Sequence, residues 1–246
     1  MIRLRRPSPF AVALTLFGIA IFVALGVWQL RRADAKEMLL TRFTQAAHAP
    51  LQSLASVEDN APATSYPHVQ VHGRFDARRV YLLDDQTHAD QIGIEVFVPF
   101  TPDNRDDALL VSLGFLPRQG VNQSLPQLPP ISEQEIILTG IYAPPPRPGL
   151  KLGGNPLPRQ RVWPKLTTWI DLPDIGADLH RAAYPRVLLL DADPATPYVR
   201  QWTPDTMPPA RHRAYALQWF TFALVALVMF FVLHRVRDDE PQQGND

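Results

Sequence analysis

A histidine and two aromatic residues with polar tips begin an apolar run near the end of the chain, in the stretch "RHRAYALQWFTFALVALVMFFVLHRVRDD". At about 100° per helical residue, Tyr215 lies about 60° and Trp219 about 20° from His212 around the helix axis, so the three residues share one face. Small residues continue this face deeper into the helix: Ala216, Ala223 and Ala226. They would let a neighbouring helix or a flat ligand approach closely.

A second apolar run, "FAVALTLFGIAIFVALGVWQL", lies near the beginning of the chain and offers a partial match to this face. If the two helices are antiparallel neighbours, Trp28 lies at the same level as His212. The spacing therefore makes His212, Tyr215, Trp219 and Trp28 candidate cofactor-binding residues.

Two interpretations of this group of residues are open. An imidazole can ligate heme iron and aromatic side chains can cover the macrocycle, so His212 could be the metal ligand of a porphyrin site. Alternatively, Trp and Tyr form interfacial belts in ordinary membrane proteins, and a flanking histidine is tolerated there. The spacing by itself favours the belt and does not predict heme.

Acidic residues cluster in "DDQTHAD", which holds Asp84, Asp85, His88 and Asp90. Such oxygen-rich clusters can bind a divalent cation, but the spacing of a calcium loop is absent, so a solvated hairpin turn is favoured. The stretch "DNRDD" is likewise a charged turn. Because no nucleophile elbow, phosphate loop or zinc-protease motif is present, we expect no catalytic residue and no enzyme activity. We also expect no metal other than the heme iron that the porphyrin interpretation would place at His212.

Aromatic and basic residues alternate in "PLPRQRVWPKLTTWIDLPD". Arg and Trp are frequent interface anchors, which would make this segment a surface for a partner protein. An edge strand with tryptophans in the core explains the same pattern and is favoured. The residues concerned are Arg159, Arg161, Trp163, Lys165 and Trp169.

Composition excludes several classes of protein. The 246 residues include no cysteine, which rules out disulfides, thiolate catalysis, iron–sulfur clusters and covalently attached c-type heme. Lys plus Arg equals Asp plus Glu at 24 each, and this balance argues against nucleic acid as a partner.

The two apolar runs are each about 20 residues long, the length needed to cross the hydrocarbon core of a bilayer. A signal peptide is the alternative for the first, but the run is long and ends in "GVWQLRR" rather than at a cleavage site. Positive charges flank both runs almost equally, so the charge count by itself does not set the orientation. Two spans place both termini on one side, and a long loop can be exported whatever its charge. We therefore expect both termini in the cytoplasm and the long middle section exported.

The predicted organisation follows from these runs. We expect a cytoplasmic N-terminus (1–9), a transmembrane helix (10–30), a helical extension (31–48), a β-rich periplasmic domain (49–210), a second transmembrane helix (211–234) and a cytoplasmic tail (235–246). Strand patterns cover residues 68–75, 79–85, 92–100, 108–116, 135–142 and 186–192, and the first two read as a hairpin. A short helix follows Trp169, capped by Asp171.

No long helical period interrupts the strands, so an antiparallel sheet is favoured over a parallel α/β sheet. The predicted fold class is a membrane protein of α+β type, in which two transmembrane helices flank a β-rich antiparallel extracytoplasmic domain.

Two motifs together resemble the surfeit locus protein 1 family. "LGVWQLRRADAKEMLL" (25–40) resembles the family's G-x-W-Q-x-x-R signature at the first membrane helix. "HRAYALQWFTFA" (212–223) resembles its H-x-x-Y-A-x-x-W-F signature at the second. "GRFD", "IGIEVFVPF" and "LLVSLGFLPRQ" fall where the family has its strand motifs, so the resemblance covers nearly the whole chain.

The resemblance implies an assembly factor for heme–copper cytochrome c oxidase in the respiratory chain, a chaperone that delivers or inserts heme a into the large subunit. In this picture His212 contacts the heme, and Trp28, Gln29, Tyr215 and Trp219 match the motif positions around it. The implied partners are the large oxidase subunit, the lipid bilayer and, as a further candidate, heme a synthase.

The chain departs from the family where the motif reads V-N-R-G-W, because residues 111–115 here are Val-Ser-Leu-Gly-Phe. The motif arginine, a fixed cation with five donors, is absent from this segment. Two other functions also remain open: a structural partner that stabilises an oxidase assembly intermediate without binding heme, and a membrane-tethered periplasmic hydrolase. The short leader before the first apolar run favours a bacterial cytoplasmic (inner) membrane.

Overall fold

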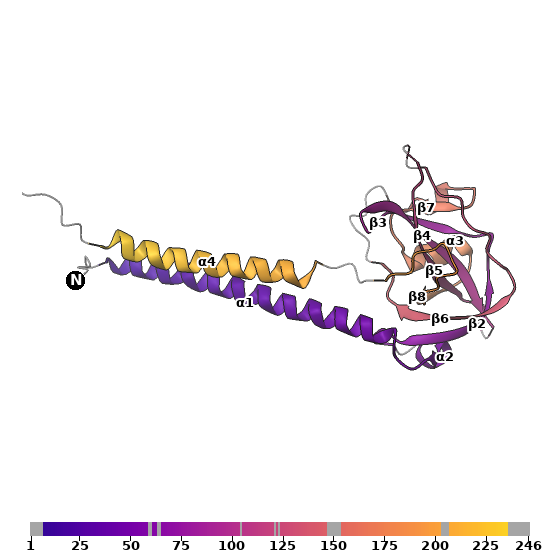
Figure 1. Cartoon of the computed structure of the whole chain (residues 1–246), viewed down its shortest axis with the longest axis horizontal. Coiled ribbons are helices and arrows are strands. Elements are labelled where there is room, and N and C mark those ends of the chain that lie inside the picture. Colours follow the sequence, from indigo (N-terminus) through magenta and orange to yellow (C-terminus); the bar gives the residue numbers. More distant parts are fainter. Residues whose placement is uncertain are drawn as a thin grey trace, which may run out of the picture. The chain divides into compact units, whose positions relative to one another are not determined.

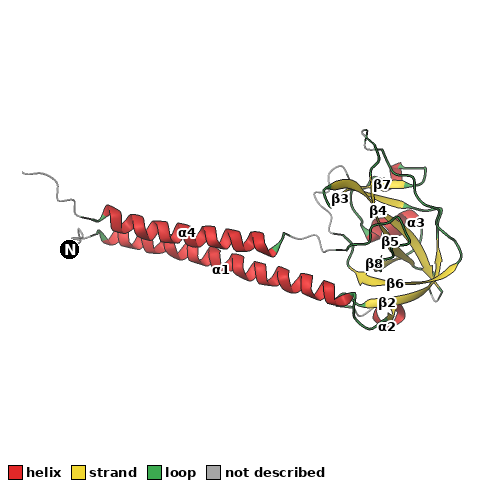
Figure 2. Ribbon diagram, in the orientation of Figure 1, coloured by secondary structure: helices red, strands yellow, loops and turns green. Residues whose placement is uncertain are grey.

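The structure, a computed structural model, describes residues 7–58, 61–62, 65–103, 105–120, 122, 124–146, 154–202 and 207–235. Most of the predicted cytoplasmic N-terminus and tail therefore lies outside the described residues. The chain divides into two compact units, one formed by residues 1–38 with 206–246 and the other by residues 39–205. Figures 1 and 2 show the elements of each unit.

The first unit is a pair of long helices. Helix α1 spans Pro9–Ala46, of which the part up to Met38 belongs to this unit, and helix α4 spans Pro209–Leu233. Both helices are long and apolar enough to cross a membrane by length and composition. They lie side by side in Figure 1 and run antiparallel, because residues early in α4 contact residues late in the apolar part of α1.

The second unit is built on a closed ring of five strands: β2 (His68–Phe75), β6 (Glu135–Ala143), β8 (Ala183–Leu190), β5 (Ala108–Pro117) and β4 (Gln91–Pro102). Neighbours in this order are paired, and β4 returns to pair with the end of β2, which closes the ring. Closure leaves no free edge within the ring itself.

Short elements extend the ring. Strand β3 (Tyr81–His88) forms a hairpin with β4, and β7 (Lys165–Thr167) adds to the outer edge of β3. Strand β1 (Gln52–Ser53) pairs with β2 and leads into the one-turn helix α2 (Leu54–Val57). A short 3₁₀ turn (Leu157–Arg159) and helix α3 (Leu172–Leu179) complete the unit.

Successive side chains of each strand point to opposite faces of the sheet, so the apolar residues form two separate clusters. One fills the inside of the ring, with Val96, Val98, Val111 and Leu188 fully buried. The other lies on the outside, where helix α3 and the last turns of α1 cover it. Phe43 and Ala46 of α1 belong to this outer cluster.

The predicted fold class is confirmed, because two apolar terminal helices flank a sheet-rich domain. The sheet is mixed rather than purely antiparallel: β1–β2, β3–β7 and β5–β8 are parallel pairs. The β5–β8 pair is parallel because a closed ring of five strands cannot alternate direction all the way round, and the other four pairs of the ring are antiparallel. The positions of the membrane boundaries within the helices stay predictions.

One predicted pairing is wrong. Strands β2 and β3 do not form a hairpin; β3 pairs with β4 and β7, and the end of β2 pairs with β4. Residues Gly73–Phe75 face Phe100–Pro102, so closure of the ring takes the edge that a β2–β3 hairpin would have used.

Helix α3 follows the sequence rules for helix ends. Asp171 is the N-cap, and its carboxylate accepts a hydrogen bond from the Asp174 amide at 3.4 Å, with Pro173 in the first turn. His180 ends the helix in the left-handed conformation, with φ of 56°. The predicted cap at Asp171 is thus confirmed.

Candidate functional site

The seam between α1 and α4 is set by residues spaced four and three apart, the pattern of helices that supercoil around each other. On α1 these are Phe22, Gly26, Gln29 and Ala33; on α4 they are His212, Ala216, Trp219 and Ala223. The small residues are buried, with Ala33 at 0% and Ala216 at 1% exposure. They bring the two backbones close together.

His212 and Gln29 meet across this seam. Nδ1 of His212 lies 2.8 Å from Oε1 of Gln29, and this amide oxygen can only accept, so Nδ1 donates the hydrogen bond. The other ring nitrogen, Nε2, is buried and has no hydrogen-bond partner among the described residues. The histidine is therefore held at one nitrogen and unsatisfied at the other.

Aromatic side chains pack one heptad deeper in the seam. The rings of Trp219 and Phe22 are stacked, with centroids 6.0 Å apart and an interplanar angle of 24°. Phe222 contacts both rings, at 5.8 Å from each centroid. Between this cluster and His212, Gly26 leaves room for Phe220, since a Cβ on Gly26 would come within 2.5 Å of the Phe220 ring.

Two of the five predicted residues lie outside the seam. Trp28 is 49% exposed and Tyr215 is 41% exposed. The Arg32 guanidinium lies over the Trp28 ring at 5.5 Å. Counted at about 100° per residue from the seam, Trp28 and Tyr215 fall on the same flank of the antiparallel pair.

The sequence therefore predicted Gln29, His212 and Trp219 in the seam but missed Phe22 and Gly26. The signal was present: Phe22, Gly26, Gln29 and Ala33 repeat the same four-three spacing as His212, Ala216, Trp219 and Ala223. Counting faces on each helix separately placed Trp28 toward the partner, whereas the matched heptads place Gln29 there.

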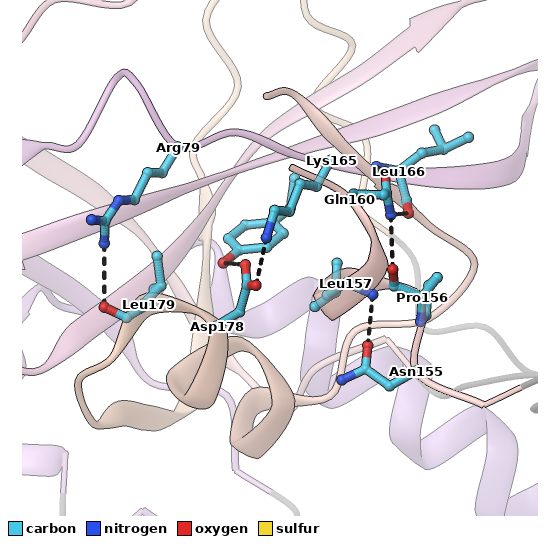
Figure 3. Close-up of polar contacts among 10 residues, drawn as sticks. Arg79, Asn155, Pro156, Leu157, Gln160, Lys165, Leu166, Asp178 and Leu179 are labelled. Atoms are coloured by element: carbon cyan, nitrogen blue, oxygen red, sulfur yellow. Dashed lines mark hydrogen bonds and ion pairs between the residues drawn. The ribbon is translucent and has the colours of Figure 1, made fainter. Parts of the chain in front are cut away.

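The sheet domain holds a buried polar network (Figure 3). Lys165 on β7 extends its ammonium to Asp178 on α3, with Nζ 2.5 Å from Oδ1, and Tyr81 donates to the other carboxylate oxygen at 2.9 Å. Burial, followed by the hydrogen bond to Asp178, raises the pKa of Tyr81 far above its usual range. Arg79 donates to the Leu179 carbonyl at the end of the same helix, at 3.2 Å.

Part of the Arg- and Trp-rich segment forms the edge strand β7 and contributes to this network. Trp169 is buried, and the half-buried Trp163 packs edge-on against Tyr81, with centroids 5.1 Å apart. The polar network fastens α3 and β7 to the ring. Arg159 and Arg161 are exposed, and their role as anchors for a partner stays a prediction.

The acidic stretch "DDQTHAD" covers the end of β3 and the two-residue turn that leads into β4. Ala89 and Asp90 have positive φ, as expected for a tight turn, and Asp84 pairs with Arg118, with Nη2 2.6 Å from Oδ1. Among the residues that the structure describes, no cluster of three or more His, Cys, Asp or Glu could hold a metal ion.

The altered segment at residues 111–115 has a structural role. Ser112 donates to the Glu95 carboxylate across the β4–β5 pair at 2.7 Å. Burial raises the pKa of Glu95 to about 7, although the bond from Ser112 lowers it. Gly114 has a φ of 126°, and a Cβ there would come within 2.8 Å of the Val199 carbonyl, so only glycine fits this bulge.

Comparison with known proteins identifies the family of this chain. Two apolar helices long enough to span a membrane flank a sheet-rich domain, and this arrangement places the chain in the class of membrane-associated proteins. The chain belongs to the SURF1 family, which its residues 16–224 match and which is linked to cytochrome oxidase assembly. A SURF1-like protein of Rickettsia conorii is 26% identical over 225 residues, which cover 88% of each chain.

Proposed function

We propose that the protein binds heme a and hands it to the large subunit of cytochrome c oxidase during assembly, and that His212 provides the iron ligand. The observation that carries this proposal is the unpartnered Nε2 of His212. A buried nitrogen without a partner is unfavourable in a structural histidine, whereas it is the state required of a metal ligand.

The surroundings of His212 support a flat, apolar cargo. Trp219, Phe22 and Phe222 provide stacked aromatic surface one heptad deeper in the seam. Trp28 and Tyr215 are exposed on one flank of the helix pair at the level of His212. A macrocycle lying along this flank would exchange lipid or water contact for aromatic contact.

Nε2 is covered in the helix pair, so loading requires His212 to rotate or the seam to open locally. The work of opening is subtracted from the binding free energy, and this keeps the affinity moderate. A moderate affinity suits a protein that must release its cargo to a partner.

The location proposed for this function is the bacterial inner membrane, with both termini cytoplasmic and the sheet domain periplasmic. The two apolar helices support a membrane location. Two spans place both termini on one side, and a long loop can be exported whatever its charge. The sheet domain would then dock on the periplasmic surface of the oxidase, with heme a synthase as a further candidate partner.

The test is heme binding by the full chain in detergent or lipid nanodiscs. The chain is co-expressed with heme a synthesis, purified, and compared with the His212→Ala variant by its absorption in the Soret region. We expect a heme spectrum in the wild type that the variant loses. Absence of heme from the wild type, or equal binding by the variant, contradicts the role of His212.

A structural partner that stabilises an assembly intermediate without heme is the second candidate. The exposed Trp28 and Tyr215 favour it, because exposed aromatic residues on a helix pair can anchor a partner or the membrane interface. Under this alternative, co-purification with the large oxidase subunit persists when heme a synthesis is deleted. Under the heme-delivery proposal, the amount of co-purified subunit that carries heme a falls in the His212→Ala variant.

A further inference from the structure

We infer that Gln29 is a positioning residue: its amide oxygen holds His212 in the tautomer that carries the proton on Nδ1, and this leaves the lone pair of Nε2 for a metal. The assignment of the tautomer stands on the helix pair alone. Only its use in metal binding rests on the proposed function.

The proton position follows from the chemistry of the two partners. The Gln29 oxygen has lone pairs and no hydrogen, so the 2.8 Å contact requires a hydrogen on Nδ1. A neutral imidazole has one N–H, which leaves Nε2 bare. The doubly protonated ring would put a second N–H at a buried atom that no described residue accepts from, and this leaves a charged donor unsatisfied.

Because the bond joins the two helices, it fixes the orientation of the His212 ring. Gln29 and His212 occupy matching heptad positions, with the buried Ala33 and Ala216 next to them along each helix. A cross-helix bond between such positions fixes the histidine ring relative to α1 as well as α4. Metal-binding histidines commonly have their second nitrogen held in this way by an oxygen acceptor.

A second histidine, the C-cap residue of α4, shows what happens without a cross-helix partner. Nδ1 of His234 bonds the Phe230 carbonyl one turn earlier at 2.7 Å. That bond joins His234 to the end of α4 and does not involve α1. His234 is therefore an internal reference, since its tautomer is set by its own helix and does not depend on Gln29.

The experiment uses the full chain with ¹⁵N-labelled histidine in lipid nanodiscs, at about pH 8.5, where an ordinary imidazole is neutral. Long-range ¹H–¹⁵N correlations distinguish a protonated ring nitrogen from a bare one. His212→Asn assigns the His212 signals by their loss. In the wild type we expect a protonated Nδ1 and a bare Nε2 at His212.

Two substitutions at Gln29 separate positioning from packing. Gln29→Leu removes the acceptor and should move His212 to the Nε2–H tautomer or to a mixture, whereas Gln29→Glu keeps an acceptor oxygen and should keep the wild-type pattern. The His234 signals should not change in either variant. A wild type with its proton on Nε2, or a Gln29→Leu variant with an unchanged pattern, overturns the inference.

A separate arm tests the link to the metal. Hemin is titrated into both the wild type and Gln29→Leu, and the affinity of the variant should be about 10- to 100-fold weaker. If the wild type binds no heme, the proposed function is contradicted, but the tautomer of His212 measured by NMR is unaffected. Equal hemin affinity in the two chains contradicts positioning for metal binding, even where the tautomer has changed.

Discussion

His68 joins three separate segments of the sheet domain. Nδ1 lies 3.1 Å from the Ala49 carbonyl, just after α1, and Nε2 lies 2.9 Å from the Asp191 carboxylate, just after β8. Both partners only accept, so His68 must carry protons on both nitrogens. Burial lowers the pKa of His68, but the bonds to Asp191 and Ala49 outweigh burial and the pKa is raised.

The sheet domain should therefore be more stable in mild acid than in base. A raised pKa in the folded state gives stabilisation that is complete below the unfolded value of about 6.5 and is lost as pH rises through the folded pKa. Glu95 acts in the same direction, because its pKa of about 7 lies above the usual value of a carboxyl group.

Urea unfolding of the full chain between about pH 5 and pH 9 measures this effect. We expect His68→Gln to flatten the dependence by about 1 to 3 kcal/mol, the range for hydrogen bonds to charged groups. Glu95→Gln should also flatten it. Stability that rises from pH 6 to pH 9 in the wild type would contradict both assignments.

Asp178 neutralises the buried Lys165, so removing only one partner should be costly. Asp178→Ala should lower the free energy of unfolding by about 3 to 5 kcal/mol, since it leaves a buried ammonium unpaired. The double variant Lys165→Met with Asp178→Leu should recover most of this loss. Arg78→Ala is the control: its ion pair with Glu133 is exposed and should contribute almost nothing.

At the scale of elements, ring closure depends on close approach of backbones. A Cβ on Gly73 would come within 2.1 Å of the Thr101 carbonyl, in the pair that closes β2 on β4. We expect Gly73→Ala to destabilise the domain by about 3 kcal/mol, because backbone rather than a flexible side chain must move.

Gly18→Ala is the matched control for that variant. Gly18 lies in α1, and a Cβ there would meet nothing within 4 Å. The exchange should be neutral or stabilise the helix by up to about 1 kcal/mol. Thermal unfolding followed by circular dichroism compares the two, and equal effects would show that the strand contact at Gly73 does not limit the domain.

The elements themselves were largely predictable from local pattern. Alternation identified six of the eight strands in the part of the chain that the structure describes, and Asp171 identified the start of α3, because these signals depend on neighbours in sequence. Pairing was less predictable. The β2–β3 hairpin was wrong since closure of the ring joins residues far apart in the chain, and β7, with three residues, is too short to show a period.

The candidate site was predictable only in part, because a sequence shows the faces of each helix but not the register between two helices. Face counting found His212 and Trp219, and the resemblance of the first helix to the family motif supplied Gln29. It could not exclude Trp28 and Tyr215, because their exposure depends on which heptad positions meet between the two helices. The hydrogen bond to Gln29 depends on this register and could not be read from either helix alone.

At the scale of the whole molecule, the antiparallel pairing of α1 with α4 implies that, if both helices span the membrane as proposed, they do so in opposite directions. Reporter fusions at the two ends should therefore report the same compartment, the cytoplasm, and an insertion at Gly120 in the sheet domain should report the periplasm. Gly120 suits an insertion because a Cβ there would meet nothing within 4 Å. Ends on opposite sides of the membrane would contradict the antiparallel pair.

The two members of the seam bond are 183 residues apart in the chain. At a synthesis rate of about 5 to 20 residues per second, Gln29 leaves the ribosome roughly 9 to 37 s before His212. During that interval the sheet domain must be made, and in the proposed orientation exported. A chain interrupted before residue 212 lacks His212 altogether, so Gln29 in such a chain has no partner for the seam bond. Synthesis of α4 is thus the event that allows the pair to form.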